Sequence, residues 1–300
     1  MVNGGSGMTN SAACVLEIRS NLGEGPLWHV GERRLYWIDL LRPGVYRFDP
    51  ANGRNEQVRA DIGSYIGGLV FRQGGGWVVV KEDGISAVDA VSGRRQVLLH
   101  PEADLPGNWF NDCKCDRRGR LWTGSADRGE KDPTGNLYVI DAKLGVRKVD
   151  SGIICANGPA FSPDGKTAYF CDSYTRRIFR YDIDPASGEV GPRRAFATVP
   201  DDAGYPDGMT VDAEGFLWNA HWDGWCVTRY APDGRIDRVV KLPVPRPTAP
   251  AFGGEGLKTL YITSASNGLS DAQLKEAPLS GSLFACEPGA PGVAEPSFAG

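Results

Sequence analysis

The feature that most constrains this chain is a motif that recurs at nearly even spacing along it. Each copy combines a turn, in most cases containing glycine, with a short strand of aromatic and β-branched residues, as in PDGKTAYFCD at 163–172. The six copies lie at 31–39, 74–81, 117–125, 163–172, 213–221 and 256–264. Their turns are 42 to 50 residues apart, a period typical of repeated supersecondary units that stack on their neighbours.

Each repeat predicts a small antiparallel sheet of four strands. Further strand-like runs follow the motifs at 45–49, 85–89, 136–141, 178–182, 227–231 and 282–286, and fourth runs stand at 96–99 and 238–242. The 40 Gly and 21 Pro among 300 residues suit frequent turns and disfavour a helical architecture. Because four short strands per repeat are typical of a propeller blade, the sequence predicts an all-β, six-bladed β-propeller.

The two ends of the chain predict how the ring closes. The last repeat lacks a fourth strand, since the residues after Cys286 are rich in Pro, Gly and Ala. The run at 14–18, ahead of the first repeat, can supply it and leave no open edge between blades. We therefore expect a single domain over residues 11–300, closed by an N-terminal strand pairing in the last blade, and a disordered leader over residues 1–10.

Charge, hydropathy and cysteine usage exclude several classes of partner. The net charge is −4 with mixed signs, which offers no basic surface for nucleic acid or an anionic membrane. No apolar run approaches the roughly 18 residues of a spanning helix, and the first ten residues lack the apolar stretch of a secretion signal. The seven Cys show no metal or redox spacing. We expect reduced, structural cysteines in a cytoplasmic monomer or small homo-oligomer.

Candidate functional residues stand at the start of the first strand of each repeat, which is the innermost strand of a blade. Four of these starts carry an oxygen-bearing side chain, at Glu24, Asn111, Asn157 and Asp207. Equivalent positions on successive blades converge on the central axis, and converging carboxylates and amides are a typical site for a hard cation. A cation would also relieve the repulsion between Glu24 and Asp207. Hydrogen bonding across the channel is the alternative use of these side chains.

Four stretches resemble motifs of the senescence marker protein, gluconolactonase and regucalcin family of six-bladed propellers. They are LGEGPLW at 22–28, FNDCKCDRRGRLW at 110–122, NGPAFSPDGKTAYF at 157–170 and PDGMTVDAEGFLW at 206–218. Members of that family are metal-dependent sugar lactonases, and a smaller group hydrolyses phosphotriester-like compounds. The resemblance implies one divalent cation, which could be Ca, Mg, Mn, Fe or Zn, with Glu24, Asn157 and Asp207 as its ligands.

The resemblance also implies which residues act on the substrate. Asn111 matches a substrate-contacting Asn beside the metal, and Asp207 matches the residue proposed to accept and return a proton. A carboxylate already bound to a metal is a weak base, so the neighbouring Asp112 remains a rival for that role.

Two parts of the chain depart from the family's pattern. Trp109 stands where members acting on aldonolactones often carry Arg, and it offers a face that either stacks on a sugar ring or packs at a blade edge. Arg128 lies in a loop at 126–133 that does not align cleanly with the family's substrate loop. It either binds an anionic substituent of the substrate or faces solvent. For His221, Trp222 and Trp225 we expect packing or hydrogen bonding.

The sequence thus favours a metal-dependent hydrolase that opens a sugar lactone to the aldonic acid. The cation would polarise the carbonyl, and Asp207 would move the proton between water and the leaving ring oxygen. Two alternatives stay open: a hydrolase of another ester or phosphotriester that uses the same metal, and a non-catalytic metal-binding propeller. A Ser/His/Asp hydrolase is disfavoured, because the chain has no G-x-S-x-G motif and its only histidines are His29, His100 and His221.

Overall fold

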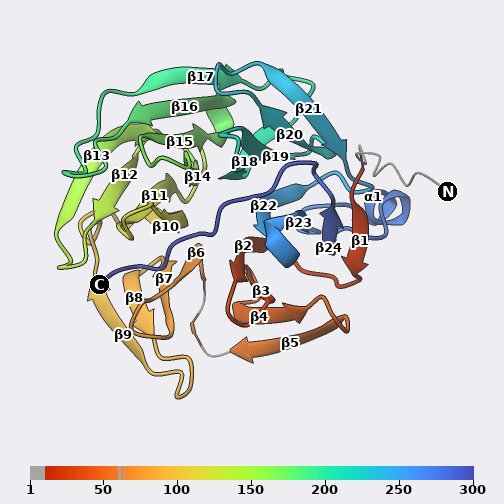
Figure 1. Ribbon diagram of the computed structural model, residues 1–300, viewed down its shortest axis with the longest axis horizontal. Coiled ribbons are helices and arrows are strands. Elements are labelled where there is room, and N and C mark those ends of the chain that lie inside the picture. The colour runs from red at the N-terminus through yellow and green to blue at the C-terminus, as the bar shows by residue number, and fades with distance from the viewer. Residues whose placement is uncertain (1–10, 60–61, 64) are drawn as a thin grey trace.

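The repeats form separate four-stranded sheets arranged around a ring (Figure 1). This computed structural model describes residues 11–59, 62–63 and 65–300, so the leader expected at 1–10 lies outside the described residues. Every sheet is antiparallel, and consecutive sheets along the chain occupy consecutive positions in the ring. The predicted six-bladed β-propeller is therefore confirmed.

The first three blades are each built from consecutive strands, with the inner strand first. The first blade contains β2 (Gly23–His29), β3 (Arg34–Asp39), β4 (Gly44–Asp49) and β5 (Arg54–Arg59). The second contains β6 (Gly68–Phe71), β7 (Trp77–Lys81), β8 (Gly84–Val88) and β9 (Arg95–Leu99). The third contains β10 (Asn108–Cys115), β11 (Leu121–Asp127), β12 (Gly135–Ile140) and β13 (Val146–Ile153).

The next two blades repeat this order, and the last blade takes one strand from the other end of the chain. The fourth blade contains β14 (Ala156–Phe161), β15 (Thr167–Asp172), β16 (Arg177–Asp182) and β17 (Arg194–Thr198). The fifth contains β18 (Tyr205–Val211), β19 (Leu217–Trp222), β20 (Cys226–Tyr230) and β21 (Ile236–Lys241). The sixth contains β22 (Pro247–Gly253), β23 (Thr259–Ser264), β24 (Leu283–Cys286) and β1 (Ala13–Leu16).

Over the residues that the structure describes, helical structure is confined to three short elements between strands. They are the 3-10 turns η1 (Ser173–Thr175) and η2 (Glu255–Leu257) and the helix α1 (Asp271–Glu276). The helix begins with a capping box, in which the Ser270 side chain accepts from the backbone of Gln273 while the Gln273 side chain accepts from the Ser270 backbone. Residues 265–282, which contain this helix, connect the second and third strands of the sixth blade.

The ring closes where β1 pairs antiparallel with β24, with Ala13 opposite Ala285 and Cys14 opposite Phe284. This is the position that the incomplete last repeat predicted for the N-terminal strand. An apolar cluster also joins the sixth blade to the first, because Trp28 and Leu35 pack with Tyr261 and Leu283. Both the strand pairing and the side-chain packing therefore connect the first and last blades.

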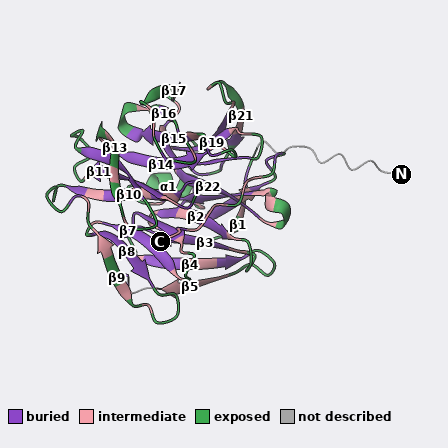
Figure 2. Cartoon of the chain, turned by 60° about the vertical axis from the view of Figure 1, so that its left-hand side comes forward, coloured by how far each residue is buried: buried purple, intermediate pink, exposed green. Residues whose placement is uncertain are grey.

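The core consists of apolar clusters between neighbouring blades. A cluster of buried residues lies at each junction around the ring, and the buried strands of Figure 2 mark this interior. Trp122 of the third blade and Phe170 of the fourth, for example, are both fully buried in the cluster between them. Since a blade buries its faces only against its neighbours, the fold depends on all six repeats.

The outer strands are the part of the sheet pattern that the sequence analysis identified least completely. It recognised outer runs in the second and fifth blades but missed β5, β13 and β17. These strands are short or polar, and most of their residues are exposed or half-buried. A strand at the rim needs no apolar face, so its sequence carries little periodic signal.

Residues 287–300 cross the ring beyond the sixth blade (Figure 1). Backbone hydrogen bonds join this segment to turns or strand ends of four blades, at Phe71, Gly119, Ala213 and Leu257. In the channel, the Glu295 carboxylate lies 3.7 Å from Lys114 Nζ and 3.4 Å from Arg117 Nη1. The segment therefore covers the end of the channel at which the inner strands finish.

Two further expectations concern the cysteines and membranes. All of the cysteines are free, and all but the half-buried Cys14 are buried, which confirms the structural role expected for them. Among the described residues, no helix has the length and apolar character needed to cross a membrane.

We predict that removal of β1 destabilises the whole propeller. Deleting residues 1–16 exposes the edge of β24 and removes the buried Ala12 from the cluster between the fifth and sixth blades. The melting temperature should fall by roughly 5 °C or more. Deleting residues 1–10 keeps β1 and is the matched control. Equal melting temperatures for the two truncated proteins would contradict the closure.

Candidate functional site

A β-bulge interrupts the inner strand of every blade except the second. The register between inner and second strands shifts at Glu24/Leu27, Phe110/Asp112, Asn157/Ala160, Pro206/Met209 and Pro247/Pro250. A bulge leaves a residue outside the ladder and redirects its side chain. Gly25 and Gly158, which follow two of the expected site residues, have φ values of 53° and 82° that suit glycine. The bulges lie at or directly beside the inner-strand positions that face the channel in the first, third, fourth and fifth blades.

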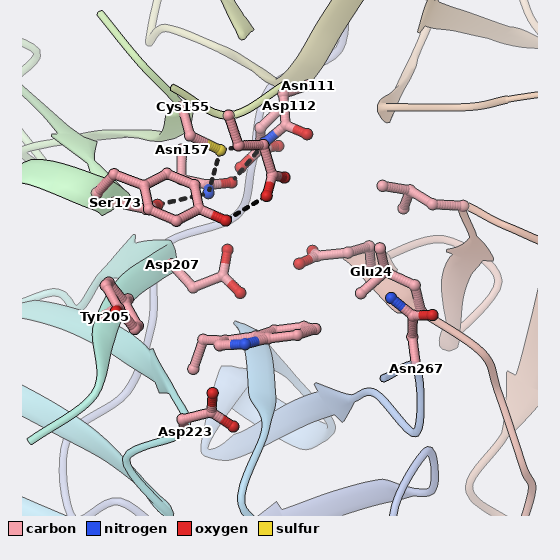
Figure 3. Close-up of a pocket in the computed structure, with 15 residues that line it drawn as sticks. Glu24, Asn111, Asp112, Cys155, Asn157, Ser173, Tyr205, Asp207, Asp223 and Asn267 are labelled. Atoms are coloured by element: carbon pink, nitrogen blue, oxygen red, sulfur yellow. Dashed lines mark hydrogen bonds between the residues drawn. The ribbon is translucent and has the colours of Figure 1, made fainter. Parts of the chain in front are cut away.

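A cavity of about 350 Å³ opens at this end of the channel. Its lining includes the four residues expected from the repeat alignment, together with Asp112: Glu24, Asn111, Asp112, Asn157 and Asp207. Glu24 and Asp207 point toward each other across the cavity, and the two asparagines lie together on one side (Figure 3). The structure therefore brings together side chains from the first, third, fourth and fifth blades.

The two asparagines are fixed by a chain of hydrogen bonds. Tyr65 donates its hydroxyl to Asn111 Oδ1 at 3.0 Å, and Asn111 Nδ2 donates to Asn157 Oδ1 at 3.0 Å. Asn157 Nδ2 in turn donates to Ser173 Oγ at 2.8 Å. Because its amide nitrogen is engaged by Ser173, the oxygen of Asn157 is held toward Asn111 and the cavity (Figure 3).

The carboxylates of Glu24, Asp112 and Asp207 are buried and lie close enough for their charges to interact. Glu24 and Asp207 are 9% and 7% exposed. Burial raises the pKa of Glu24 well above its usual range, and the negative charges of Asp207 and Asp112 raise it further. Burial, followed by the charge of Asp112, likewise raises the pKa of Asp207. Burial raises the pKa of Asp112 to about 7, although backbone N–H groups and the charge of Lys114 oppose the shift.

The charge of the lining favours a cation over an anion. Among the described residues that line the cavity, every one that carries a formal charge is acidic: Glu24, Asp112, Glu130, Asp207 and Asp223. The part of the chain that the structure describes contains no group of three His, Cys, Asp or Glu side chains arranged as metal ligands. The expected donor set is of another kind, with two carboxylates and one amide oxygen, and these hard donors fit a hard divalent cation.

Trp109 and Arg128 lie outside the cavity lining. The Trp109 ring stacks on Tyr65 with centroids 4.7 Å apart, and the Arg128 guanidinium lies 5.5 Å from the centre of the Trp109 ring. Arg128 also forms an ion pair with Glu82 at 3.2 Å. Both side chains are therefore separated from the cavity by Tyr65, whose hydroxyl is hydrogen-bonded to the lining residue Asn111.

The sequence analysis missed a second group of lining residues. They include Glu130, Tyr174, Tyr205, Trp222, Asp223 and Asn267. Glu130 comes from the loop at 126–133 and accepts a hydrogen bond from the Tyr174 hydroxyl. Most of them occupy loops, turns or the end of a second strand, which have no fixed place in the repeat, so an alignment of inner strands cannot find them. Tyr205 is the exception, since it begins the inner strand β18 two residues before Asp207.

The three residues near the end of β19 have different surroundings. The imidazole of His221 is buried between the Ala203 carbonyl and the Tyr230 hydroxyl, which confirms the expected hydrogen bonding. Burial lowers its pKa to about 4. Trp222 packs against Arg246, as expected, and it also lines the cavity, which the sequence analysis did not anticipate. Trp225 lies in a turn at a positive φ and is 41% exposed, and its backbone N–H donates to the Pro245 carbonyl.

A family model described as SMP-30/Gluconolactonase/LRE-like region matches residues 22–266. The chain belongs to this family. The SMP-30/gluconolactonase relatives include the 6-deoxy-6-sulfogluconolactonase of Pseudomonas putida, 36% identical over 98% of this chain and 100% of that protein. The L-arabinolactonase of Azospirillum brasilense is 35% identical, with 96% of each chain covered. The crystal structure of regucalcin from Agrobacterium tumefaciens, a calcium-binding protein by its description, superposes with a TM-score of 0.89 at 30% identity, covering 96% of this chain and 97% of that chain.

We predict that Asp112 makes the metal-free protein less stable as the pH rises. Its folded pKa of about 7 lies above the reference value of 3.8, so the folded state holds the proton more tightly than the unfolded state. The free energy of unfolding should therefore fall between about pH 4 and pH 7 and show no further change from this group above pH 7.

Thermal unfolding in the presence of a chelator measures this effect. We expect the melting temperature of the wild type to fall by roughly 5 °C more across this interval than that of Asp112→Asn, which does not titrate. The variant Asp202→Asn, on an exposed turn, should keep the wild-type slope. An unchanged slope in Asp112→Asn would contradict the prediction.

Proposed function

We propose that this protein is a divalent-metal-dependent hydrolase that opens a sugar lactone to the aldonic acid. The observation that carries the proposal is the convergence of Glu24, Asn157 and Asp207 in a cavity whose charged lining is entirely acidic over the described residues. Membership of the SMP-30/gluconolactonase family supports it, as do relatives named as lactonases that match over nearly the whole chain.

Glu24, Asn157 and Asp207 would hold the cation. Their two carboxylates and one amide oxygen are acceptors on different blades, and Asn111 and Ser173 hold the amide in one orientation. Hard cations take six or more oxygen ligands, so three protein ligands leave room for water and substrate. When bound, the cation supplies Lewis acidity to the lactone carbonyl and offsets the negative charge that develops on its oxygen.

Asp207 is the proton acceptor that the geometry favours over Asp112. Both oxygens of Asp112 accept backbone N–H groups, from Cys113 at 2.7 Å and from Gly158 at 3.0 Å. Asp207 points into the cavity (Figure 3), which places its carboxylate where an attacking water would lie. The attacking water gives one proton to Asp207 as its oxygen bonds to the carbonyl carbon. Asp207 returns that proton to the ring oxygen when the carbon–oxygen bond breaks.

Asn111 orients the site and contacts the substrate. Its amide nitrogen donates to Asn157 Oδ1 and to the Ala156 carbonyl, while its oxygen accepts from Tyr65. The sequence suggested Trp109 and Arg128 as substrate contacts. Here they act indirectly, because Trp109 stacks on Tyr65 and Arg128 lies over the Trp109 ring. Glu130 and Trp222 are the further lining residues that we assign to the substrate side of the cavity.

Base uptake at constant pH tests the proposed reaction. Opening a lactone yields a carboxylic acid, so hydrolysis of a neutral aldonolactone at pH 7 should consume base faster than the spontaneous background. A chelator should abolish the excess rate, and added divalent cation should restore it. Uptake that never exceeds the background with any of several divalent ions would contradict a lactonase and favour a non-catalytic metal-binding propeller.

Two substitutions separate metal binding from proton transfer. Asn157→Ala removes one neutral ligand, so metal affinity should fall by roughly 10- to 100-fold, and excess metal should restore much of the rate. Asp207→Asn keeps the shape but removes the charge and basicity. Saturating metal should therefore restore binding but leave kcat at least 100-fold low.

Isothermal titration with the cation and steady-state kinetics provide the two measurements. Full rescue of Asp207→Asn by metal would move the base to Asp112. If neither substitution alters metal binding, the ligand assignment is wrong.

A further inference from the structure

Three arginines border the cavity, but none belongs to its lining among the described residues. Each instead lies against an aromatic ring. Arg246 lies 4.7 Å from the centre of Trp222, Arg176 lies 3.8 Å from the centre of Tyr205, and Arg128 lies 5.5 Å from the centre of Trp109. Two of these rings, Trp222 and Tyr205, line the cavity. Arg246 and Arg176 therefore support the aromatic wall from outside the lining, whereas Arg128 packs on a ring that does not line the cavity.

The positive charge of Arg246 is already neutralised. Its Nε and Nη2 atoms lie 2.6 and 3.3 Å from the two carboxylate oxygens of Asp223, and its Nη1 atom donates to the Asn267 carbonyl. Its side chain is 14% exposed. A guanidinium whose donors are engaged in this way is unavailable to an incoming anion.

The other nearby cations are engaged in the same manner. Arg176 donates to the Gly204 carbonyl and lies 3.4 Å from Asp201. Arg128 pairs with Glu82. Lys114, deeper in the channel, donates to the Met209 carbonyl and lies 3.7 Å from Glu295. Each of these cations therefore has protein partners of its own.

The remaining wall consists of hydrogen-bond acceptors, amides and aromatic rings. Glu130 and Asp223 are carboxylates, Asn267 is an amide, and Tyr205 and Trp222 are aromatic. Carboxylates accept hydrogen bonds from sugar hydroxyls, and aromatic faces pack against the C–H groups of a sugar ring. An added carboxylate, sulfonate or phosphate would meet like charge without a cationic partner. With Asp223 paired to Arg246, four acidic groups remain in the described lining, and a divalent cation offsets only two negative charges.

We propose that the cavity selects neutral, polyhydroxylated lactones and discriminates against lactones that carry an anionic substituent. This inference rests on the proposed lactonase function and specifies its substrate class. The Pseudomonas putida relative is named for a sulfonated lactone. Since that relative shares the fold, the proposed selectivity depends on the side chains of this cavity and not on the fold itself.

Steady-state kinetics with D-glucono-1,5-lactone and its 6-phosphate, both in the presence of divalent cation, test the inference. We expect kcat/KM to be roughly 100-fold lower for the phosphate, since like-charge contacts cost several kcal/mol. The difference should shrink as ionic strength rises from 0.02 to 0.5 M, because salt screens the repulsion.

The possible outcomes separate this inference from the proposed function. Equal kcat/KM values for the two lactones, or a preference for the phosphate, overturn the selectivity and leave the lactonase function standing. If neither lactone is opened faster than the background with any divalent ion, both proposals fall.

The variant Asp223→Asn tests the mechanism of selection. Asp223 has φ = 59°, a left-handed conformation that Asn accepts readily. The substitution removes the charge that neutralises Arg246, so the selectivity ratio between the two lactones should fall by about tenfold, which corresponds to 1.4 kcal/mol. Asp233→Asn, which breaks an exposed Asp–Arg pair in the β20–β21 turn, is the matched control and should leave the ratio unchanged. An unchanged ratio in Asp223→Asn overturns the electrostatic mechanism.

Discussion

The bulge near the start of the inner strands is the constraint on which the rest of this structure depends. A regular inner strand would pair every residue with the second strand and turn alternate side chains toward the neighbouring blades. The bulge follows directly after Glu24 and Asn157, which still pair with Ile38 and Cys171, and it includes Asp207. All three side chains line the cavity. Close packing between neighbouring inner strands also restricts which residue can occupy the bulge. A Cβ at Gly208 would lie 2.4 Å from that of Ala249 on the next inner strand, so only glycine fits there. The same local geometry in successive blades brings together oxygen atoms that are distant in sequence.

The closed ring holds the bulged inner strands, and the ligand residues on them, in fixed positions relative to one another. Each ligand position comes from a different blade, and the blades are held by the apolar clusters between them and by the pairing of β1 with β24. Residues 287–300 add a tie across the opposite end of the channel, where Glu295 meets Lys114 and Arg117. Among the described residues, this segment therefore covers the end of the channel opposite the cavity. Any change that loosens one blade junction should also move a ligand relative to the other two.

Sequence reasoning predicted the features that recur in every repeat, and it missed the residues in loops that differ between repeats. The spacing of the turns gave the number of blades, and aligning the inner strands gave Glu24, Asn111, Asn157 and Asp207, because repeated backbone geometry places equivalent residues at equivalent points around the axis. Glu130, Tyr65 and Trp222 come from loops and second-strand ends, where blades differ in length, so no alignment within the chain could place them. Trp109 follows the same logic. Packing was one of its two expected roles, but its actual partner, Tyr65, lies in the loop before β6 and could not be found from the repeat.

The acidic cavity links the proposed activity to the stability of the protein. Burial raises the pKa values of Glu24, Asp112 and Asp207, so near neutral pH the metal-free fold must either bury repelling charges or retain protons. Apolar side chains would avoid this cost, but they could neither bind a cation nor accept a proton. A cation that binds the folded protein and not the unfolded chain adds stability in proportion to the logarithm of its concentration. The groups that destabilise the empty site are therefore those through which metal binding stabilises the fold, and resistance to thermal unfolding should follow the availability of the metal.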